Sequence, residues 1–433
     1  MDVAFLYDIY RKYPTICTDT RAIKPGCIFF ALTGSNFNGN QFVEEALQNG
    51  AAYAVTSDLS LEKTNTLYVP DTLVALQSLA NYHRRHFNKP FIAITGSNGK
   101  TTTKELVTTV LARKYRVHAT SGNFNNHIGV PLTILGMPDD MDIAVIEMGA
   151  NHAGEIKLLC EIAMPTHGVI TNIGKAHLEG FGSVEGVQKA KGELFDYLHD
   201  HKGFAFVNAD DPAIVQLGRH LIDKTIYGFN QNGDPAVLFE YSIDENTNGF
   251  TIKNKNLSIH STMFGHYNAT NMLAAITIGQ HFQVDTQLMV ESLSSFVTGA
   301  NRSETISYSG CTIVKDAYNA NPSSMELALH AFAKCYRKGI VILGDMKELG
   351  TESEESHQHI IRIASGLDIR HIILVGNEFK NALSKMGDTP IPNISTAINI
   401  EEIKSKWNWE DHKGNTILLK GSRSMHLEKL LET

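Results

Sequence analysis

The chain has 433 residues, of which 42% are hydrophobic and 19% charged, a composition that excludes collagen, coiled coil and wholesale disorder. The formal net charge of −8, from 38 basic and 46 acidic side chains, lacks the lopsided balance of a nucleic-acid binder. No run of about 18 consecutive apolar residues is present, so we expect no membrane insertion.

The beginning of the chain, MDVAFLYDIYRKY, has Asp2 and Asp8 where a signal peptide would be basic and then apolar, so we expect no export signal. The five cysteines are odd in number and are never spaced as C-x-x-C, which argues against a disulfide framework and a zinc ribbon. Both observations favour a reducing, cytoplasmic location.

At about 100–200 residues per domain, the length predicts two to four domains, and three zones follow one another along the chain. In the first, residues 1–84, helical spacing predicts a helix at 43–51 that ends at Gly50. Short apolar runs in this zone predict strands at 27–32, 52–57 and 66–70.

The second zone, residues 85–298, opens with an apolar strand at 91–95, a glycine-rich loop and an amphipathic helix. This succession begins a parallel α/β unit. Alternating polar and apolar residues between 236 and 262 predict a small antiparallel excursion. Further buried strands are predicted at 143–148, 168–173 and 204–208.

The third zone, residues 299–433, returns to strands separated by helical segments, a spacing that predicts a doubly wound parallel sheet. Its strands are predicted at 312–318, 339–345, 371–376 and 416–421.

The strongest motif is the loop TGSNGKTT, residues 95–102. Its glycines let backbone N–H groups face phosphate oxygens, Lys100 can reach the β- and γ-phosphates, and the Thr101 hydroxyl can bind Mg²⁺. The strict G-x-x-x-x-G-K-[ST] pattern fails, because Ile94 stands where its first glycine should be. The alternative is a plain Gly-Asn turn between a strand and a helix.

Several weaker candidates follow predicted strands. Glu147 ends the strand at 143–148, where a carboxylate can hold Mg²⁺ or merely be solvated. His177 lies past the next strand, and on local evidence it is an ordinary structural histidine. Lys189, Lys191 and Glu193 lie on a helical stretch whose spacing alone predicts a solvated face.

Three further segments carry polar residues. Asn125 and Asn126 could bind a ligand or make a turn. Asn268 could read adenine or, more simply, cap a helix. Arg302 is a candidate phosphate ligand, and Asp316 could bind ribose hydroxyls at a strand end.

Taken in order, these motifs closely resemble the Mur ligase family over nearly the whole chain. They read TGSNGKTT, GNFNNHIGVP, EMGANHAGEI, AHLEGFGS, KAKGE, GHYNATN, DAYNANP and LGDMKELG. The segments 18–21 and 25–32 look like the UDP-binding domain of that family, which implies that Thr20 and Arg21 contact substrate. Asn38 and Asn40 stand where family members usually carry Asp and His.

The resemblance implies an α/β protein of three domains. These are a UDP-muramoyl-peptide-binding domain at 1–84, a central ATP-binding domain at 85–298 and a Rossmann-like domain at 299–433. The central domain would have a P-loop-type parallel sheet with a small antiparallel excursion.

The resemblance also implies an ATP-dependent amide ligase of cytoplasmic peptidoglycan precursor synthesis, most similar to the members that add D-alanyl-D-alanine. ATP would phosphorylate the terminal carboxylate of UDP-N-acetylmuramoyl-tripeptide, and the amine of D-alanyl-D-alanine would attack the acyl phosphate, releasing ADP and phosphate. The D-N-P-R motif of the diaminopimelate-adding member is missing here, since the corresponding residues are Asn321, Pro322, Ser323 and Ser324.

The family pattern implies a role for each candidate. Asn268 would contact adenine, Asp316 the ribose, Arg302 a phosphate, and Asn125 and Asn126 the substrate. The loop residues Gly96, Ser97, Asn98, Gly99, Lys100, Thr101 and Thr102 would bind ATP. Mg²⁺ would be held by Thr101 and Glu147, and a second Mg²⁺ by His177 and a carbamylated Lys191.

Three other functions remain open at this point. The chain could be another ligase of the same fold, adding diaminopimelate or polyglutamate. It could be a nucleotide-switched binding protein with slow ATP turnover, or a P-loop kinase that leaves a stable phosphorylated product. We expect a monomer in each case.

Overall fold

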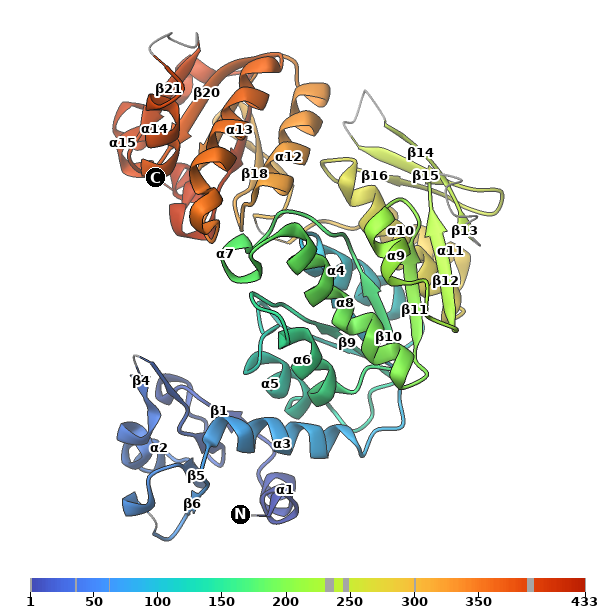
Figure 1. The fold of residues 1–433 in the computed structure, drawn as a ribbon, viewed down its shortest axis with the longest axis vertical. Helices are drawn as coiled ribbons and strands as arrows, with labels where there is room; N and C mark the ends of the chain where they lie inside the picture. The colour runs from blue at the N-terminus through green and yellow to red at the C-terminus, as the bar shows by residue number, and fades with distance from the viewer. Residues whose placement is uncertain are drawn as a thin grey trace.

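The computed structural model describes residues 2–35, 37–61, 63–229, 237–243, 249–299, 301–387 and 393–432. Three units follow one another along the long axis of the molecule, each built on its own β-sheet (Figure 1). In the described part of the chain, no helix is both long and apolar enough to cross a membrane.

The N-terminal unit contains a parallel four-stranded sheet in the order β1-β2-β5-β6. Its strands are β1 (Ile16–Cys17), β2 (Ile28–Phe30), β5 (Tyr53–Thr56) and β6 (Thr66–Tyr68), with a hairpin of β3 (Thr33–Gly34) and β4 (Phe37–Asn38). Its helices are α1 (Val3–Lys12), α2 (Val43–Gln48) and α3 (Thr72–Arg84). Strands β2, β5 and β6 and helix α2 fall within the segments that the sequence predicts, whereas β1 and the β3–β4 hairpin were not predicted.

Helix α3 connects this unit to the next. It begins where the Asp71 carboxylate accepts hydrogen bonds from the backbone N–H groups of Leu73 and Val74. Its buried side chains Leu76 and Leu79 belong to one continuous apolar core shared with the central unit.

The central unit has a seven-stranded, wholly parallel sheet in the order β13-β12-β11-β10-β7-β9-β8. Its strands are β7 (Phe91–Thr95), β8 (Val117–Ala119), β9 (Ile143–Glu147), β10 (His167–Ile170), β11 (Phe204–Asn208), β12 (Lys224–Gly228) and β13 (Val237–Leu238). A separate antiparallel sheet joins β14 (Glu240–Ile243), β15 (Phe250–Lys253) and β16 (Ser258–Ser261). It confirms the predicted excursion, except that residues 236 and 244–248 lie outside the described residues.

Helices cover both faces of the central sheet (Figure 1). They are α4 (Lys100–Leu111), α5 (Gly129–Leu135), α6 (Glu155–Ala163), α7 (Leu178–Phe181), α8 (Val184–Asp200), α9 (Pro212–Leu217), α10 (Tyr267–His281) and α11 (Thr286–Ser294). Alternate residues of β7 supply two cores: Phe91 and Ala93 pack with α5, α6 and α8, whereas Ile92 and Ile94 pack with α4 and α10.

The C-terminal unit has a six-stranded sheet in the order β17-β18-β22-β19-β20-β21, parallel except for β17. Its strands are β17 (Glu304–Tyr308), β18 (Cys311–Asp316), β19 (Gly339–Gly344), β20 (Ile369–Val375), β21 (Ile394–Ala397) and β22 (Thr416–Lys420). Its helices are α12 (Pro322–Cys335), α13 (Ser353–Gly366), α14 (Asn377–Ser384) and α15 (Ile400–Lys406). Apolar cores lie on both faces of the sheet, which confirms the doubly wound α/β prediction.

The order of strands in the central sheet determines which candidate residues lie close together. β9 and β10 flank β7 in the central sheet. The segments that leave their carboxyl ends therefore meet at one edge, as ligand-binding segments do in open α/β sheets.

Candidate active site

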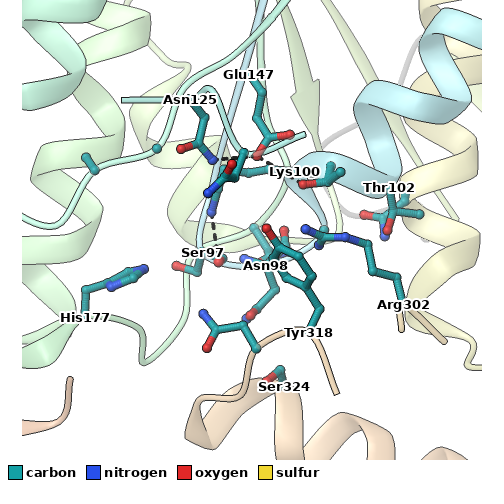
Figure 2. Close-up of a pocket in the computed structure, with 18 of the residues that line it drawn as sticks. Ser97, Asn98, Lys100, Thr102, Asn125, Glu147, His177, Arg302, Tyr318 and Ser324 are labelled. Atoms are coloured by element: carbon teal, nitrogen blue, oxygen red, sulfur yellow. Dashed lines mark hydrogen bonds between the residues drawn. The ribbon is translucent and has the colours of Figure 1, made fainter. Parts of the chain in front are cut away.

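A cavity of about 400 Å³ lies where this edge of the central sheet faces the C-terminal unit. It contains most of the residues singled out from the sequence (Figure 2). They are Ser97, Asn98, Gly99, Lys100, Thr101, Thr102, Asn125, Asn126, Glu147, His177, Asn268, Arg302 and Asp316. Gly96, Lys191, Thr20 and Arg21 do not line it.

The glycine loop has a backbone that other residues could not adopt. Gly96 has φ 141° and Gly99 has φ 79°. A Cβ at Gly96 would lie 2.0 Å from Thr171 Oγ1, and one at Gly99 would lie 2.6 Å from Asn271 Oδ1. The loop is held from the neighbouring strand end, because the N–H groups of Ser97 and Asn98 donate to the Asn172 backbone and side-chain oxygens, both at 3.0 Å.

Lys100 begins α4 and lies across the loop. Its Nζ donates to the carbonyl oxygens of Gly96 at 2.7 Å and Ser97 at 3.3 Å. Burial lowers the pKa of Lys100, and the nearby Glu147 carboxylate opposes that shift. The amine is thus held at the point where a phosphate on the loop would need a positive charge.

Glu147 lies at the end of β9 and is almost fully buried. Its Oε1 accepts hydrogen bonds from Thr101 Oγ1 at 3.1 Å and Asn125 Nδ2 at 2.8 Å, whereas its Oε2 is buried with no hydrogen-bond partner. Figure 2 shows Asn125 beside Glu147 above the loop. A buried, unpartnered carboxylate oxygen beside a threonine hydroxyl fits Mg²⁺, which takes hard oxygen ligands.

Within the described residues, no three His, Cys, Asp or Glu side chains are grouped closely enough to hold a metal ion by themselves. Mg²⁺ at Glu147 would therefore need oxygens from a bound phosphate as well, as is usual for Mg²⁺ at nucleotide sites.

The prediction of a solvated helix face at Lys191 is wrong. Its side chain has no exposed surface, and its Nζ donates to Ala150 O at 3.2 Å from within α8. Burial and the neighbouring Lys100 charge lower the pKa of Lys191 well below its ordinary value. Helical spacing could have revealed this burial, because Lys191 shares the buried face of α8 with Val187, Leu194 and Leu198.

The neighbouring Glu193 holds the beginning of α6. Its carboxylate accepts from the N–H of Gly154 at 2.6 Å and from the N–H of Lys157 at 2.8 Å, so it caps the first turn of α6. Two members of the KAKGE motif therefore have distinct local environments, one inside the protein and one at a helix N-terminus.

His177 has a left-handed backbone with φ 51° and lines the cavity. Its Nδ1 forms an ion pair with the Glu348 carboxylate, which comes from the C-terminal unit. The imidazole lowers the pKa of Glu348. The interpretation of His177 as an ordinary structural histidine does not account for this contact across two units.

The asparagines are used in different ways. Asn268 does not cap α10: its Nδ2 donates to Phe264 O at 2.8 Å, and its Oδ1 accepts from Asn271 at 3.0 Å. Asn126 Oδ1 accepts from the N–H groups of Ile128 and Gly129, which is the turn chemistry expected before α5.

Four side chains of the C-terminal unit that line the cavity were either assigned a role from the sequence or missed. Arg302 lies over the ring of Tyr318, 3.6 Å from its centroid. Asp316 pairs with Lys420 Nζ at 2.6 Å, and Lys420 is 2% exposed. Tyr318 belongs to the motif DAYNANP, but no role was predicted for it. The only sign of Lys420 in the sequence is its position at the end of an apolar strand.

The N-terminal candidates lie away from this cavity. Arg21 is an exposed side chain paired with Asp19, and Thr20 begins a short 3₁₀ helix. At the two positions where the family pattern differs, Asn38 Oδ1 accepts from the N–H of Asn40, and Asn40 Oδ1 accepts from Thr56 Oγ1 and the N–H of Ser57. Both asparagines are thus engaged locally.

Comparison with known families finds three adjoining matches. They are the Mur ligase family catalytic domain at residues 12–84, the Mur ligase middle domain at 94–279 and the Mur ligase glutamate ligase domain at 301–423.

Individual relatives match over almost the full length. The UDP-N-acetylmuramoyl-tripeptide–D-alanyl-D-alanine ligase of Bacillus subtilis is 36% identical, covering 96% of this chain and 92% of the relative. That of Escherichia coli is 32% identical with the same coverage. Among solved structures, MurF from Acinetobacter baumannii is 30% identical with a TM-score of 0.86, covering 96% of this chain and 92% of that one. MurF from Thermotoga maritima in complex with ADP is 26% identical with a TM-score of 0.85, covering 96% of both chains.

Proposed function

This chain belongs to the Mur ligase family, and from that premise we propose that it joins D-alanyl-D-alanine to UDP-N-acetylmuramoyl-tripeptide at the expense of ATP. The terminal carboxylate of the tripeptide takes the γ-phosphoryl group of ATP to give an acyl phosphate and ADP. The amine of D-alanyl-D-alanine then attacks the acyl carbon, a proton leaves the nitrogen, and phosphate departs as the amide forms.

The observation that carries this proposal is the environment of Glu147. A carboxylate with one buried, unpartnered oxygen lies beside Thr101 and the glycine loop, inside the cavity that both units line. The ion that Glu147 and Thr101 would hold, Mg²⁺, supplies charge neutralisation on the phosphates. The loop N–H groups and Lys100 would fix those phosphates, and little covalent help from the protein is needed.

The C-terminal unit would close the nucleotide site from the other side. Asp316 would accept from the ribose hydroxyls, Arg302 would bind a phosphate, and Asn268 would meet the adenine. Closure over the reacting atoms excludes water, which would otherwise hydrolyse an acyl phosphate.

Lys191 would carry a carbamate. Its buried neutral amine would form a bond to the carbon of CO₂ and lose one proton, so that an anion replaces an ammonium that Mg²⁺ would repel. This anion and His177 would hold a second Mg²⁺. Asn125, Asn126, Thr20 and Arg21 are proposed to contact the UDP-linked peptide.

We further infer a cytoplasmic monomer. In the described chain all five cysteines are free, as is usual in a reducing compartment. Light scattering of the purified protein and fractionation of the producing cell test the two statements separately.

Phosphate release tests the function. With ATP, Mg²⁺ and UDP-N-acetylmuramoyl-tripeptide, we expect release only when D-alanyl-D-alanine is added, and mass spectrometry should find the pentapeptide product. Matched reactions contain diaminopimelate or glutamate in place of the dipeptide, and turnover with either would indicate another ligase of this fold. ATP hydrolysis indifferent to every amine would indicate a nucleotide switch, and a stable phosphorylated substrate would indicate a kinase.

A further inference from the structure

The cavity histidine and the loop at the end of β19 meet across the interface between the central and C-terminal units. Glu348 lies in the segment LGDMKELG, which the proposed reaction leaves without a role. Its carboxylate pairs with His177 Nδ1, and its backbone oxygen accepts from the N–H of Glu179 at 3.3 Å. One residue of the C-terminal unit thus holds both the side chain and the following turn of the histidine segment.

Both residues have unusual backbones. His177 has φ 51° and Glu348 has φ 63°, a region that residues other than glycine seldom adopt. Such conformations persist only where the surrounding structure imposes them, and they concentrate at functional sites. Both ends of the contact therefore come from backbone in the left-handed region.

The loop that carries Glu348 is held from inside its own unit. The N–H of Met346 donates to His357 Nε2 at 3.0 Å, and the N–H of Lys347 donates to Ser422 Oγ at 3.0 Å. The Asp345 carboxylate accepts from the N–H of Phe379 at the start of α14. The carboxylate of Glu348 is thus presented from a fixed position.

The two units touch at further points around this contact. Asn321 Nδ2 donates to Asn98 Oδ1 at 2.7 Å, and Ser323 Oγ accepts from the N–H of Lys175 at 2.9 Å. The Glu348 contact therefore forms only when the C-terminal unit is docked on the glycine loop and on the segment before His177.

We propose that Glu348 is the positioning residue for His177: its carboxylate lies against Nδ1, so it favours a proton on that nitrogen and leaves Nε2 as the nitrogen available in the cavity. A carboxylate on the far nitrogen commonly orients a histidine that binds a metal or phosphate. Here the carboxylate comes from another unit, so the histidine is oriented only when the C-terminal unit is docked. This inference rests on the proposed function for the role of His177.

Nitrogen-15 NMR of histidine-labelled protein without substrates tests the geometry directly. The His177 signals are assigned by their loss in His177→Asn. We expect a proton on Nδ1 and none on Nε2 in the unaltered protein, and a shift toward the Nε2–H tautomer in Glu348→Ala. Glu348→Gln retains an acceptor oxygen and should keep the Nδ1–H tautomer. Glu352→Ala, which removes an exposed carboxylate four positions further on, is the matched control and should change nothing.

Kinetics tests the consequence. Loss of a residue that orients a ligand commonly costs about 10–100-fold, so Glu348→Ala should lower kcat by about that factor while KM for ATP stays within about twofold. Glu348→Gln should lose less, and Glu352→Ala should match the unaltered enzyme.

The proposal is overturned if His177 carries its proton on Nε2 in the unaltered protein, or if Glu348→Ala leaves its signals unchanged. It is equally overturned if Glu348→Ala raises KM for ATP at constant kcat. The NMR result needs no ligation, so it still decides the role of Glu348 if the unaltered enzyme proves not to add D-alanyl-D-alanine.

Discussion

Asp316 and Lys420 form an ion pair of 2.6 Å at the carboxyl ends of neighbouring strands, although 104 positions separate them in the chain. The register of β18 against β22 places these two residues opposite one another. The lysine is almost wholly buried, and both side chains line the cavity. A residue proposed to bind ribose is thus held by a charge that a neighbouring strand supplies.

Breaking this pair should destabilise the C-terminal unit. Asp316→Asn leaves the buried Lys420 ammonium unpaired, which commonly costs about 3–5 kcal/mol, so we expect a clear fall in Tm. The double variant Asp316→Asn/Lys420→Met removes the orphaned charge and should recover part of the loss in a thermal unfolding series. Lys406→Met breaks the exposed pair with Glu402 in the same unit, and it should cost less than about 1 kcal/mol. Equal losses in the two single variants would contradict the buried pairing.

The ion pair also shows what the sequence could and could not predict. Each of the two strands was predicted from its own apolar run, because burial on both faces of a parallel sheet leaves a continuous apolar signal. Their adjacency was not predicted, since the pairing of strands 104 positions apart depends on the whole topology. Lys420 was therefore missed, while Asp316 was found from its place at a strand end.

Lys100→Ala should abolish ligation and leave the fold intact. The side chain contacts only loop carbonyls among its described hydrogen bonds, so its loss removes positive charge at the phosphates rather than packing. Loss of a preorganised charge stabiliser commonly costs about 10²–10³-fold in kcat. Lys114→Ala, at an exposed lysine after the same helix that bonds to Phe282 O and Gln283 O, is the control for kcat and Tm. Near-normal turnover in folded Lys100→Ala would remove the nucleotide-loop assignment.

Glu147→Gln should raise the Mg²⁺ requirement more than it weakens nucleotide binding. The amide keeps the shape and the contacts of Oε1 but removes the charge, and hydrogen bonds and contacts to charged groups are worth about 1.5–3 kcal/mol. We therefore expect at least about a tenfold increase in the Mg²⁺ concentration for half-maximal rate. ATP affinity, measured by calorimetry without Mg²⁺, should change little. An unchanged Mg²⁺ requirement would contradict metal binding by Glu147 and leave it a purely structural role.

The burial of Lys191 was predictable, although the five residues KAKGE alone predict a solvated face. Over the whole of α8, Val187, Lys191, Leu194 and Leu198 recur at helical spacing and lie on its buried face. The charge of the lysine hid this pattern, and only the order of motifs pointed to a function for it.

Stability should fall on acidification through a histidine in the N-terminal unit. Burial lowers the pKa of His83 from 6.5 to about 4, and its ring contacts the hydroxyl of Tyr7. The unfolded chain then binds more protons than the folded one between about pH 6.5 and 4, so the stabilisation is present above this window and is lost as pH falls through it. His83→Gln should show a smaller drop in Tm between pH 7.5 and 5 than the unaltered protein, whereas His199→Gln, at an exposed histidine of the central unit, should show the full drop. Identical pH profiles for the two variants would exclude His83 as the cause.

The last prediction concerns the chemical state of Lys191. Burial and the Lys100 charge favour its neutral amine, which is the form that bonds to CO₂ with loss of a proton. If the carbamate forms, CO₂-free buffer should lower the ligation rate and bicarbonate should restore it. Lys191→Ala should be inactive yet folded by its Tm, and it should not respond to the low bicarbonate concentration that restores the unaltered enzyme.

Small carboxylates then separate a carbamate from a lysine needed for other reasons. Acetate or formate at high concentration should restore part of the activity of Lys191→Ala, because they supply negative oxygens in the space that the side chain leaves. His177→Ala lacks a nitrogen ligand rather than an anion, so the same additives should not rescue it. A fully active Lys191→Ala variant would show that no carbamate is required. An inactive, folded variant that neither carboxylate rescues would show that the lysine is needed and would leave its carbamate role without support.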